Sequence, residues 1–167
     1  CFFGSNYKIA QIVSKISDLE VVYCEDRSFN VDVYSFCQLH DIKFVIVHTE
    51  EDLFLSLSGS DTNDLGISCG FGIIFKKEHI KFFKHGIWNI HYGDLPENRG
   101  RHPIAWDFIN GNKVFAVTIH QINENIDQGL LLAKAYIDRD LKDTTEDIEN
   151  KIEVELAKGV IKAAFNN

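Results

Sequence analysis

The sequence has no methionine and no long apolar run. No stretch of its 167 residues approaches the roughly 18 uninterrupted apolar residues of a membrane-spanning helix, so we expect no membrane partner. The start has no basic region followed by an apolar stretch and a cleavage site, which argues against a signal peptide and favours the cytoplasm. Because the chain begins with Cys and opens within what reads as a strand, we expect that it is not the whole gene product.

Several metal-site and cofactor motifs are also missing. None of the four cysteines forms a C-x-x-C pair, so a zinc knuckle is not expected, and Cys37 and Cys69 read as core thiols. No H-E-x-x-H spacing exists, which argues against a metal site built from the histidines and a nearby carboxylate; the residues weighed for it are His91, His102, His120 and Asp127. No G-x-G-x-x-G dinucleotide fingerprint follows the first apolar segment.

The composition is that of an ordinary globular protein with an acidic balance. Hydrophobic residues make up 45% and charged residues 25% of the chain. The length predicts a single domain over residues 1–167. The formal charge of −8 argues against tRNA or DNA as a partner, because nucleic-acid affinity depends on neutralising phosphates. A small phosphorylated ligand in a local basic pocket remains compatible with this charge.

Apolar periodicity divides the chain into alternating strands and helices. The expected strands are Cys1–Phe3, Leu19–Cys24, Lys43–Val47, Leu65–Cys69, Ile87–His91, Lys113–Ile122 and Gly129–Ile137. The expected helices are 7–17, Asp32–His40, one beginning after an N-cap at Thr49, Lys76–Lys84, Arg101–Asn110, and one capped by residues 143–146 that runs to about Phe165. Lys43–Val47 reads as a strand buried on both faces. This order predicts an α/β fold with a mainly parallel sheet and an antiparallel pair at one end.

The most informative stretch is Trp88–Pro103, which begins with Asn89 and His91. Residues two apart in a strand point to the same face, so an amide donor and a titratable imidazole project together. Such a pair suits stabilisation of negative charge on a reacting carbonyl. Sites of open α/β sheets lie beyond the carboxyl ends of strands, which predicts one crevice shared by this pair, residues 4–6, residues 70–72 and the loop near Asp127.

Each other candidate at that crevice has two readings. Residues 4–6, with Asn6, fit either a contact to a ligand phosphate or sugar, or a tight turn. Residues 70–74 fit either a pocket for a flat heteroaromatic ring or a connection packed on the core. Asp127 precedes Gln128-Gly129 and is either a turn residue or, if the fold brings it to His91, a carboxylate that raises the imidazole pKa. The set lacks a Ser or Cys nucleophile, so it favours acyl transfer to an amine supplied by the substrate.

The segment from Asn89 onward resembles a known family. The run N-I-H-Y-G-D-L-P-E-N-R-G-R-H-P-I-A-W, then N-G, then A-V-T-I-H-Q-I-N-E-N-I-D-Q-G-L-L-L-A-K, is similar to the catalytic domain of the folate-dependent formyltransferases. The strong match covers residues 87–135. The combination of N-x-H, L-P, R-G and a downstream D-x-G is more specific than any of its pieces. The resemblance implies a Rossmann-like α/β fold.

The resemblance also implies roles for individual residues. It makes Asn89, His91 and Asp127 the catalytic triad and 10-formyltetrahydrofolate the formyl donor. His91 as an imidazolium and the Asn89 amide would stabilise the oxyanion, and Asp127 would keep His91 charged. The pterin would contact two segments, with these residues as the implied contacts: Phe71, Gly72, Ile73, Ile74, Asn123 and Ile126.

Within this family the sequence looks most like the N-formyltransferases of nucleotide-linked amino sugars. The implied acceptor is a dTDP- or UDP-linked 4-amino-4,6-dideoxy sugar or a similar compound, and a homodimer is left open as the assembly. Candidate acceptor contacts are Asn6, Lys77, Arg99 and Arg101, for which a solvated surface role is an equal alternative. The other readings are the tRNA enzyme, disfavoured by the charge, the phosphoribosylglycinamide enzyme, a formyltetrahydrofolate hydrolase, and an inactive folate- or nucleotide-binding domain.

Overall fold

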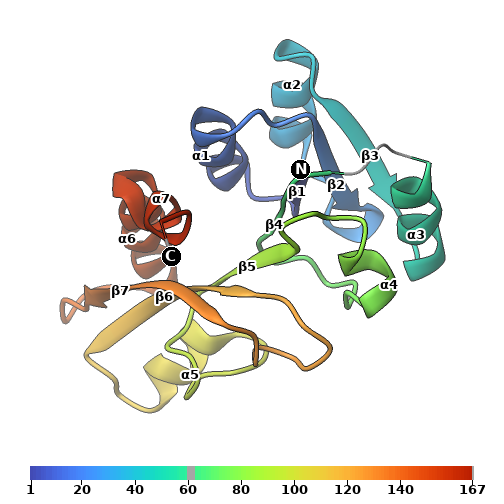
Figure 1. The fold of residues 1–167 in the computed structure, drawn as a ribbon. Coiled ribbons are helices and arrows are strands. Elements are labelled where there is room, and N and C mark those ends of the chain that lie inside the picture. Colours follow the sequence, from blue (N-terminus) through green and yellow to red (C-terminus); the bar gives the residue numbers. More distant parts are fainter. Residues whose placement is uncertain (60–62, 167) are drawn as a thin grey trace. The chain divides into compact units, whose positions relative to one another are not determined.

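The computed structural model of the protein describes residues 1–59 and 63–166 (Figure 1). The chain forms two compact units, one of residues 1–89 and 122–124 and the other of residues 90–121 and 125–167. The strand Ile87–His91 contributes its first three residues to the first unit and its last two to the second. This division does not test the prediction that residues 1–167 act as one domain.

The first unit is a parallel sheet with helical connections. Its strands are β1 (Phe2–Phe3), β2 (Val21–Glu25), β3 (Lys43–Val47), β4 (Gly66–Ser68) and the start of β5 (Ile87–His91). Its helices are α1 (Tyr7–Ile16), the short η1 (Asp26–Ser28), α2 (Val31–Leu39), α3 (Glu50–Ser58) and α4 (Lys77–Ile80). The strand order is β3-β2-β1-β4-β5, and every pair is parallel. Parallel neighbours end at the same edge, so Glu25, Ser68 and Asn89 lie toward the carboxyl edge of this sheet.

Side-chain caps start α1 and α3 at the positions where the sequence predicts these helices to begin. The Asn6 side chain accepts from the Ile9 N–H at 3.1 Å at the start of α1. The Thr49 side chain accepts from the Asp52 N–H, and the Asp52 carboxylate accepts from the Thr49 N–H, which completes a capping box at α3. Each cap satisfies backbone donors that the first helical turn leaves without an intrahelical partner. Asn6 is therefore occupied as a cap.

An aromatic core fills the first unit around Phe3. The Phe3 ring stacks on Tyr23 at a centroid distance of 5.0 Å and meets Phe75 edge-on at 4.9 Å. Buried aliphatic residues from α3 and β5 complete the cluster; they include Leu53, Leu57 and Ile87. This packing fixes the segment after β4 to the sheet, because Phe75 lies in it.

One prediction about this sheet is wrong. The strand β3 has the predicted bounds but is not buried on both faces, because it is the edge strand of the sheet. Only Val47 is fully buried in it, and Ile46 is 41% exposed. A short β-branched run does not by itself distinguish an edge strand from a central one.

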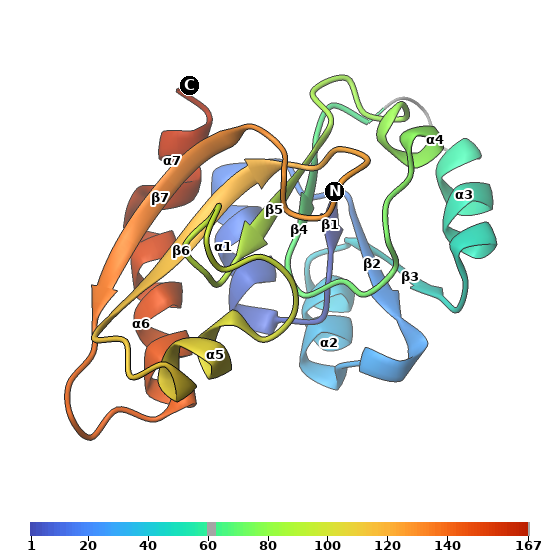
Figure 2. The ribbon, with the colours of Figure 1, turned by 90° about the horizontal axis from the view of Figure 1, so that it is seen from below.

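The second unit is an antiparallel hairpin with helices. It contains the end of β5, α5 (Pro103–Ile109), β6 (Val114–Gln121), β7 (Leu131–Asp138), α6 (Thr145–Glu155), the π-helical turn η2 (Leu156–Val160) and α7 (Ile161–Ala164). The strands β6 and β7 pair antiparallel from Val114 opposite Asp138 onward, with a shift of register at Ile119/His120. The helices α6 and α7 pack on this hairpin, as Figure 2 illustrates.

The last helix is interrupted, whereas the sequence predicts one that is continuous to about Phe165. The cap predicted within residues 143–146 is Thr144, whose hydroxyl accepts from the Asp147 N–H. The interruption is at Gly159, which has a φ of +140°. Glycine adopts this angle readily because it lacks a Cβ. Four apolar residues of this segment are nonetheless fully buried, namely Ile148, Ile152, Leu156 and Ile161.

The predicted fold class is confirmed. Strands β1 to β5 are parallel, β6 and β7 form the antiparallel end, and helices connect and flank them. The expected core thiols are also confirmed, because Cys37 and Cys69 are buried and free. No helix in residues 1–59 and 63–166 is long and apolar enough to cross a membrane.

Candidate active site

His91 is the last residue of β5 and is buried, with 6% of its surface exposed. Its Nε2 lies 2.6 Å from the backbone oxygen of Asn98. A carbonyl oxygen can only accept, so Nε2 carries a proton and donates it. The other ring nitrogen, Nδ1, is 3.7 Å from Oδ2 of Asp127. In the neutral imidazole Nδ1 therefore carries no proton, and its lone pair is on the side of the ring that faces Asp127.

Asp127 lies in the loop between β6 and β7 with a left-handed backbone, φ +53°. Only 11% of its side chain is exposed. Its Oδ2 accepts a hydrogen bond from the Gly100 N–H at 2.8 Å, and its Oδ1 is 3.5 Å from Nε2 of His120. Within the second unit the fold therefore brings Asp127 close to His91, which is the condition under which the sequence gives this carboxylate a role beyond a turn.

From the sequence, His120 is weighed only as a metal ligand, and its position beside Asp127 is not predicted. It is 2% exposed, and its Nδ1 lies 3.0 Å from the Gln121 backbone oxygen. A carbonyl oxygen can only accept, so Nδ1 carries a proton, and Nε2 lies on the side of the carboxylate. The alternating pattern of β6 could have indicated this position, because it places His120 on the same strand face as Thr118. Both polar side chains are fully buried.

Burial corrects one prediction about charge. Burial lowers the pKa of His91, and this effect outweighs the Asn98 carbonyl and the Asp127 carboxylate, which act to raise it. The expected imidazolium is therefore not the resting form; His91 is neutral at pH 7. Burial acts to raise the pKa of Asp127, but hydrogen bonds from His120 and the Gly100 N–H and the two nearby imidazoles lower it overall. The resting site is an ionised carboxylate between two imidazole nitrogens.

Hydrogen bonds join the loop after β5 to the hairpin of β6 and β7. The Thr118 hydroxyl donates to the Gly93 backbone oxygen at 2.7 Å and accepts from the Leu95 N–H at 3.3 Å. Lys134 donates to the carboxylate of Asp94 at 2.5 Å. A Cβ at Gly93 would lie 2.8 Å from His91 Nε2, so only glycine allows the chain to turn this closely over the imidazole.

Asn89 is the third residue of β5 and His91 the fifth. Alternation along the strand places the two side chains on the same face, as the sequence predicts. Asn89 belongs to the first unit and His91 to the second. The prediction of one crevice shared by residues 4–6, residues 70–72, Asn89/His91 and the Asp127 loop draws on both units and stays a prediction.

The predicted donor contacts have different environments. Phe71 is partly buried and stacks on Phe75 at 5.5 Å, so one side of its ring is used by the core. The Gly72 N–H donates to Oε2 of the buried Glu25 at 2.6 Å, and Arg27 holds the other oxygen of that carboxylate at 2.7 Å. Neither Glu25 nor Arg27 is identified from the sequence, since the bond between Glu25 and Gly72 spans 47 residues.

The remaining donor and acceptor contacts lie mostly at the surface. Asn123 is exposed in the first unit, and Ile126, in the second, is 60% exposed. Lys77 is 3.9 Å from Glu124, and Arg101 is exposed. Arg99 Nε donates to the backbone oxygen of Asp127 at 3.3 Å, which places this cation beside the site in the second unit.

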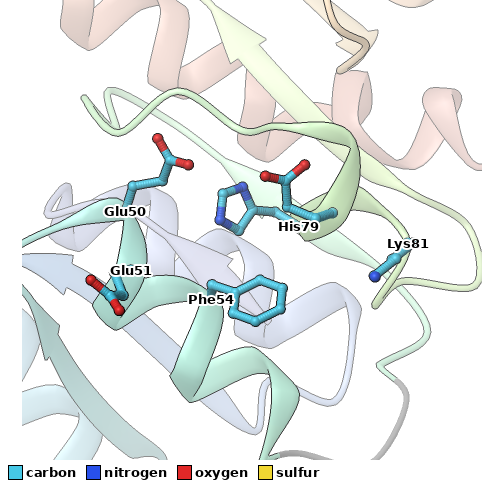
Figure 3. Close-up of a pocket in the computed structure, with 6 residues that line it drawn as sticks. Glu50, Glu51, Phe54, His79 and Lys81 are labelled. Carbon is cyan, nitrogen blue, oxygen red and sulfur yellow. The ribbon is translucent and has the colours of Figure 1, made fainter.

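Two hollows lie in the first unit. One has a volume of about 470 Å³, and its walls include Ile73, Ile74, Glu25 and His48. The other, of about 510 Å³, lies between α3 and α4 (Figure 3). Its walls include Glu50, Glu51, Phe54 and the buried His79. Neither hollow includes His91 or Asp127 among its walls. The described residues contain no group of three His, Cys, Asp or Glu arranged to hold a metal ion.

Comparison with known proteins places the chain in a family. The family model described as Formyl transferase matches residues 11–164. A methionyl-tRNA formyltransferase of Prochlorococcus marinus (strain AS9601) is 34% identical over 134 residues, which are 79% of this chain and 41% of that protein. A GDP-perosamine N-formyltransferase of Brucella melitensis biotype 1 is 26% identical over 130 residues, 78% of this chain and 50% of that protein.

A solved structure has the same fold. The crystal structure of phosphoribosylglycinamide formyltransferase from Bacillus halodurans aligns with a TM-score of 0.82 and 20% identity, covering 98% of this chain and 91% of that one. The chain spans about half or less of the length of the two curated relatives described above. From the family model and these likenesses, the chain belongs to the formyl transferase family.

Proposed function

We propose that the protein is an N-formyltransferase that moves a formyl group from 10-formyltetrahydrofolate to the amine of a nucleotide-linked amino sugar. The observation that carries the proposal is the ionised Asp127 between His91 and His120. His91 ends β5, the strand that also carries Asn89. The family supplies the reaction class. Asn89 and His91 lie in different units, so the proposal includes residues 1–167 acting as one catalytic domain.

The chemistry follows from the protonation states of the site. The acceptor amine attacks the formyl carbon, and the carbonyl electrons move onto its oxygen, where the Asn89 amide donates a hydrogen bond. The attacking amine loses a proton, and the nitrogen that leaves the donor gains one. The His91–Asp127 pair holds that proton in between, because neutral His91 has a lone pair on Nδ1 and the carboxylate stabilises the resulting imidazolium. In this account the imidazolium forms during the reaction.

The donor contacts in this proposal are residues 71–74, Asn123 and Ile126. Ile73 and Ile74 support it, because they line a hollow of the first unit with apolar side chains. The other walls of this hollow are mostly polar or charged, and they include Glu25, Arg27 and Glu50. Glu25 contributes indirectly, since it fixes the Gly72 N–H and with it the course of this loop.

An amino sugar is the acceptor we favour, and Met-tRNA is the second candidate. The GDP-perosamine enzyme among the relatives and the charge of −8 favour the sugar, since a tRNA acceptor requires many phosphate contacts. The higher identity to methionyl-tRNA formyltransferases favours tRNA. Arg99 and Arg101 are the cations that we assign to the acceptor phosphates, with Asn6 and Lys77 as further contacts.

Acceptor discrimination tests this proposal directly. Formyl transfer from 10-formyltetrahydrofolate is measured with dTDP-, UDP- and GDP-linked amino sugars, glycinamide ribonucleotide and Met-tRNA, and also with no acceptor. We expect transfer to an amino sugar and a rise in melting temperature with its nucleotide, because a ligand that binds only the native state stabilises it. Transfer to Met-tRNA or glycinamide ribonucleotide alone would contradict the acceptor, and loss of formyl without an acceptor would indicate a hydrolase.

A further inference from the structure

The acidic side chain Asp107 is buried next to the site and has no part in the chemistry described above. It lies in α5 with 2% of its surface exposed. Its Oδ1 accepts hydrogen bonds from the side-chain amides of Asn98 at 2.5 Å and Asn112 at 2.7 Å. Both donors are neutral amides. A carboxylate is costly to bury, so its position calls for an explanation beyond packing.

Asn98 connects Asp107 to His91. Its side-chain amide donates to Asp107, and its backbone oxygen accepts from His91 Nε2 at 2.6 Å. Two residues further along, the Gly100 N–H donates to Asp127 Oδ2. Residues 98–100 therefore carry both the acceptor for one site residue and a donor to another. All of these residues belong to the second unit.

We propose that Asp107 is a positioning residue of this site, which holds residues 98–100 so that His91 keeps its proton on Nε2. The two His91 nitrogens then have different roles, with Nε2 occupied by the Asn98 carbonyl and Nδ1 facing Asp127. Without the Asp107 anchor, the Asn98 carbonyl loses its fixed direction. The imidazole then shifts toward the Nδ1–H form, in which Nδ1 cannot accept the amine proton. This inference rests on the proposed function of the His91–Asp127 pair.

The test reads the tautomer of His91 in the ligand-free protein. Spectra of ¹⁵N-labelled histidine distinguish Nε2–H from Nδ1–H rings, and a His91→Gln variant assigns the signal. We expect the Nε2–H form in the parent and a shift toward Nδ1–H in Asp107→Ala. Asp107→Asn should keep the parent form, since its amide oxygen still accepts. Asn112→Ala is the matched control, because it removes the other hydrogen bond to Oδ1 and leaves Asn98 in place; it should also keep the parent form.

Asn98→Ala provides the same test if Asp107→Ala does not fold. It breaks the Asn98–Asp107 bond from the other side, retains the carbonyl that faces His91, and should give the same shift. A parent-like tautomer in Asp107→Ala, or in Asn98→Ala if that is the folded variant, overturns the proposal. An equal shift in Asn112→Ala also overturns it, since loosening of α5 then explains the effect.

Activity separates this inference from the proposed function. If the parent transfers formyl groups, Asp107→Ala should lower kcat about tenfold with little change in the KM for the acceptor. If the parent has no transferase activity, the proposed function fails, while the tautomer measurement still decides whether Asp107 positions His91.

Discussion

At the scale of single residues, the site depends on which atoms carry protons. The Asn98 carbonyl fixes a proton on His91 Nε2, and the Gln121 carbonyl fixes one on His120 Nδ1. Asp127 faces the other ring nitrogen of each histidine, Nδ1 of His91 and Nε2 of His120. The sequence indicates the pair Asn89/His91 and the carboxylate, but not the protonation state, because burial and carbonyl contacts arise only in the folded chain.

The lowered pKa of His91 predicts a pH dependence of stability. The unfolded state binds a proton near pH 6.5, whereas buried His91 binds it only at lower pH, so the unfolded state holds more protons in that window. The free energy of unfolding should therefore fall as the pH decreases from about 7.5 to 5.5. Asp127 adds nothing there, since its pKa is already below its usual value.

Urea unfolding at both pH values, without ligand, measures this effect. His91→Gln should lose less stability than the parent between the two pH values. His85→Gln is the matched control, because His85 is exposed, and it should follow the parent. Equal pH dependence in His91→Gln and the parent contradicts the assignment of burial as the dominant influence on His91.

At the scale of elements, the loop between β6 and β7 delivers Asp127. The loop closes where Gly129 approaches the end of β6, and a Cβ on Gly129 would lie 1.6 Å from the Gln121 backbone oxygen. The sequence predicts a turn here from Asp-Gln-Gly, but not the reason for glycine, which is a contact with a strand eight residues earlier. The loop and the hairpin are thus coupled.

Replacing this glycine should disturb both stability and the site. Gly129→Ala should lower the free energy of unfolding by on the order of 1–3 kcal/mol, since overpacking against backbone forces a shift. Asp127 should move with it and formyl transfer should fall. Gly59→Ala is the control, because its Cβ would lie 3.7 Å from the Leu55 oxygen and its effect should stay within about 0.5 kcal/mol. Parent-like unfolding and transfer in Gly129→Ala contradict this account.

The sequence predicts elements better than their environments. The bounds of β3 and β5 agree with the prediction. The exposure of β3 is not predicted, because edge position depends on neighbours distant in sequence. The break at Gly159 has a local signal, a glycine inside a helical apolar pattern, which the sequence prediction overlooks. Glu25 and Asp107 are not predicted either, because their partners are set by the fold.

At the scale of the whole molecule, the family and the fold are defined, and the acceptor is proposed. The two compact units divide the proposed triad, with Asn89 in one and His91 and Asp127 in the other. The relatives act, by name, on different acceptors, and this chain spans 41% and 50% of the two that are curated. Every acceptor assignment depends on the proposed catalytic role of the His91–Asp127 pair.

The formyl-transfer rate of Asp127→Asn tests the proposed role of the His91–Asp127 pair most directly. Asparagine tolerates the left-handed backbone of residue 127 and keeps an oxygen for the Gly100 N–H, so the loop should remain in place. It removes the charge that stabilises protonated His91. Asp32→Asn, at an exposed position of α2, is the control. We predict a loss of transfer on the order of 100- to 1000-fold in Asp127→Asn, with an unchanged fold. Parent-like transfer in a folded Asp127→Asn protein would contradict the account.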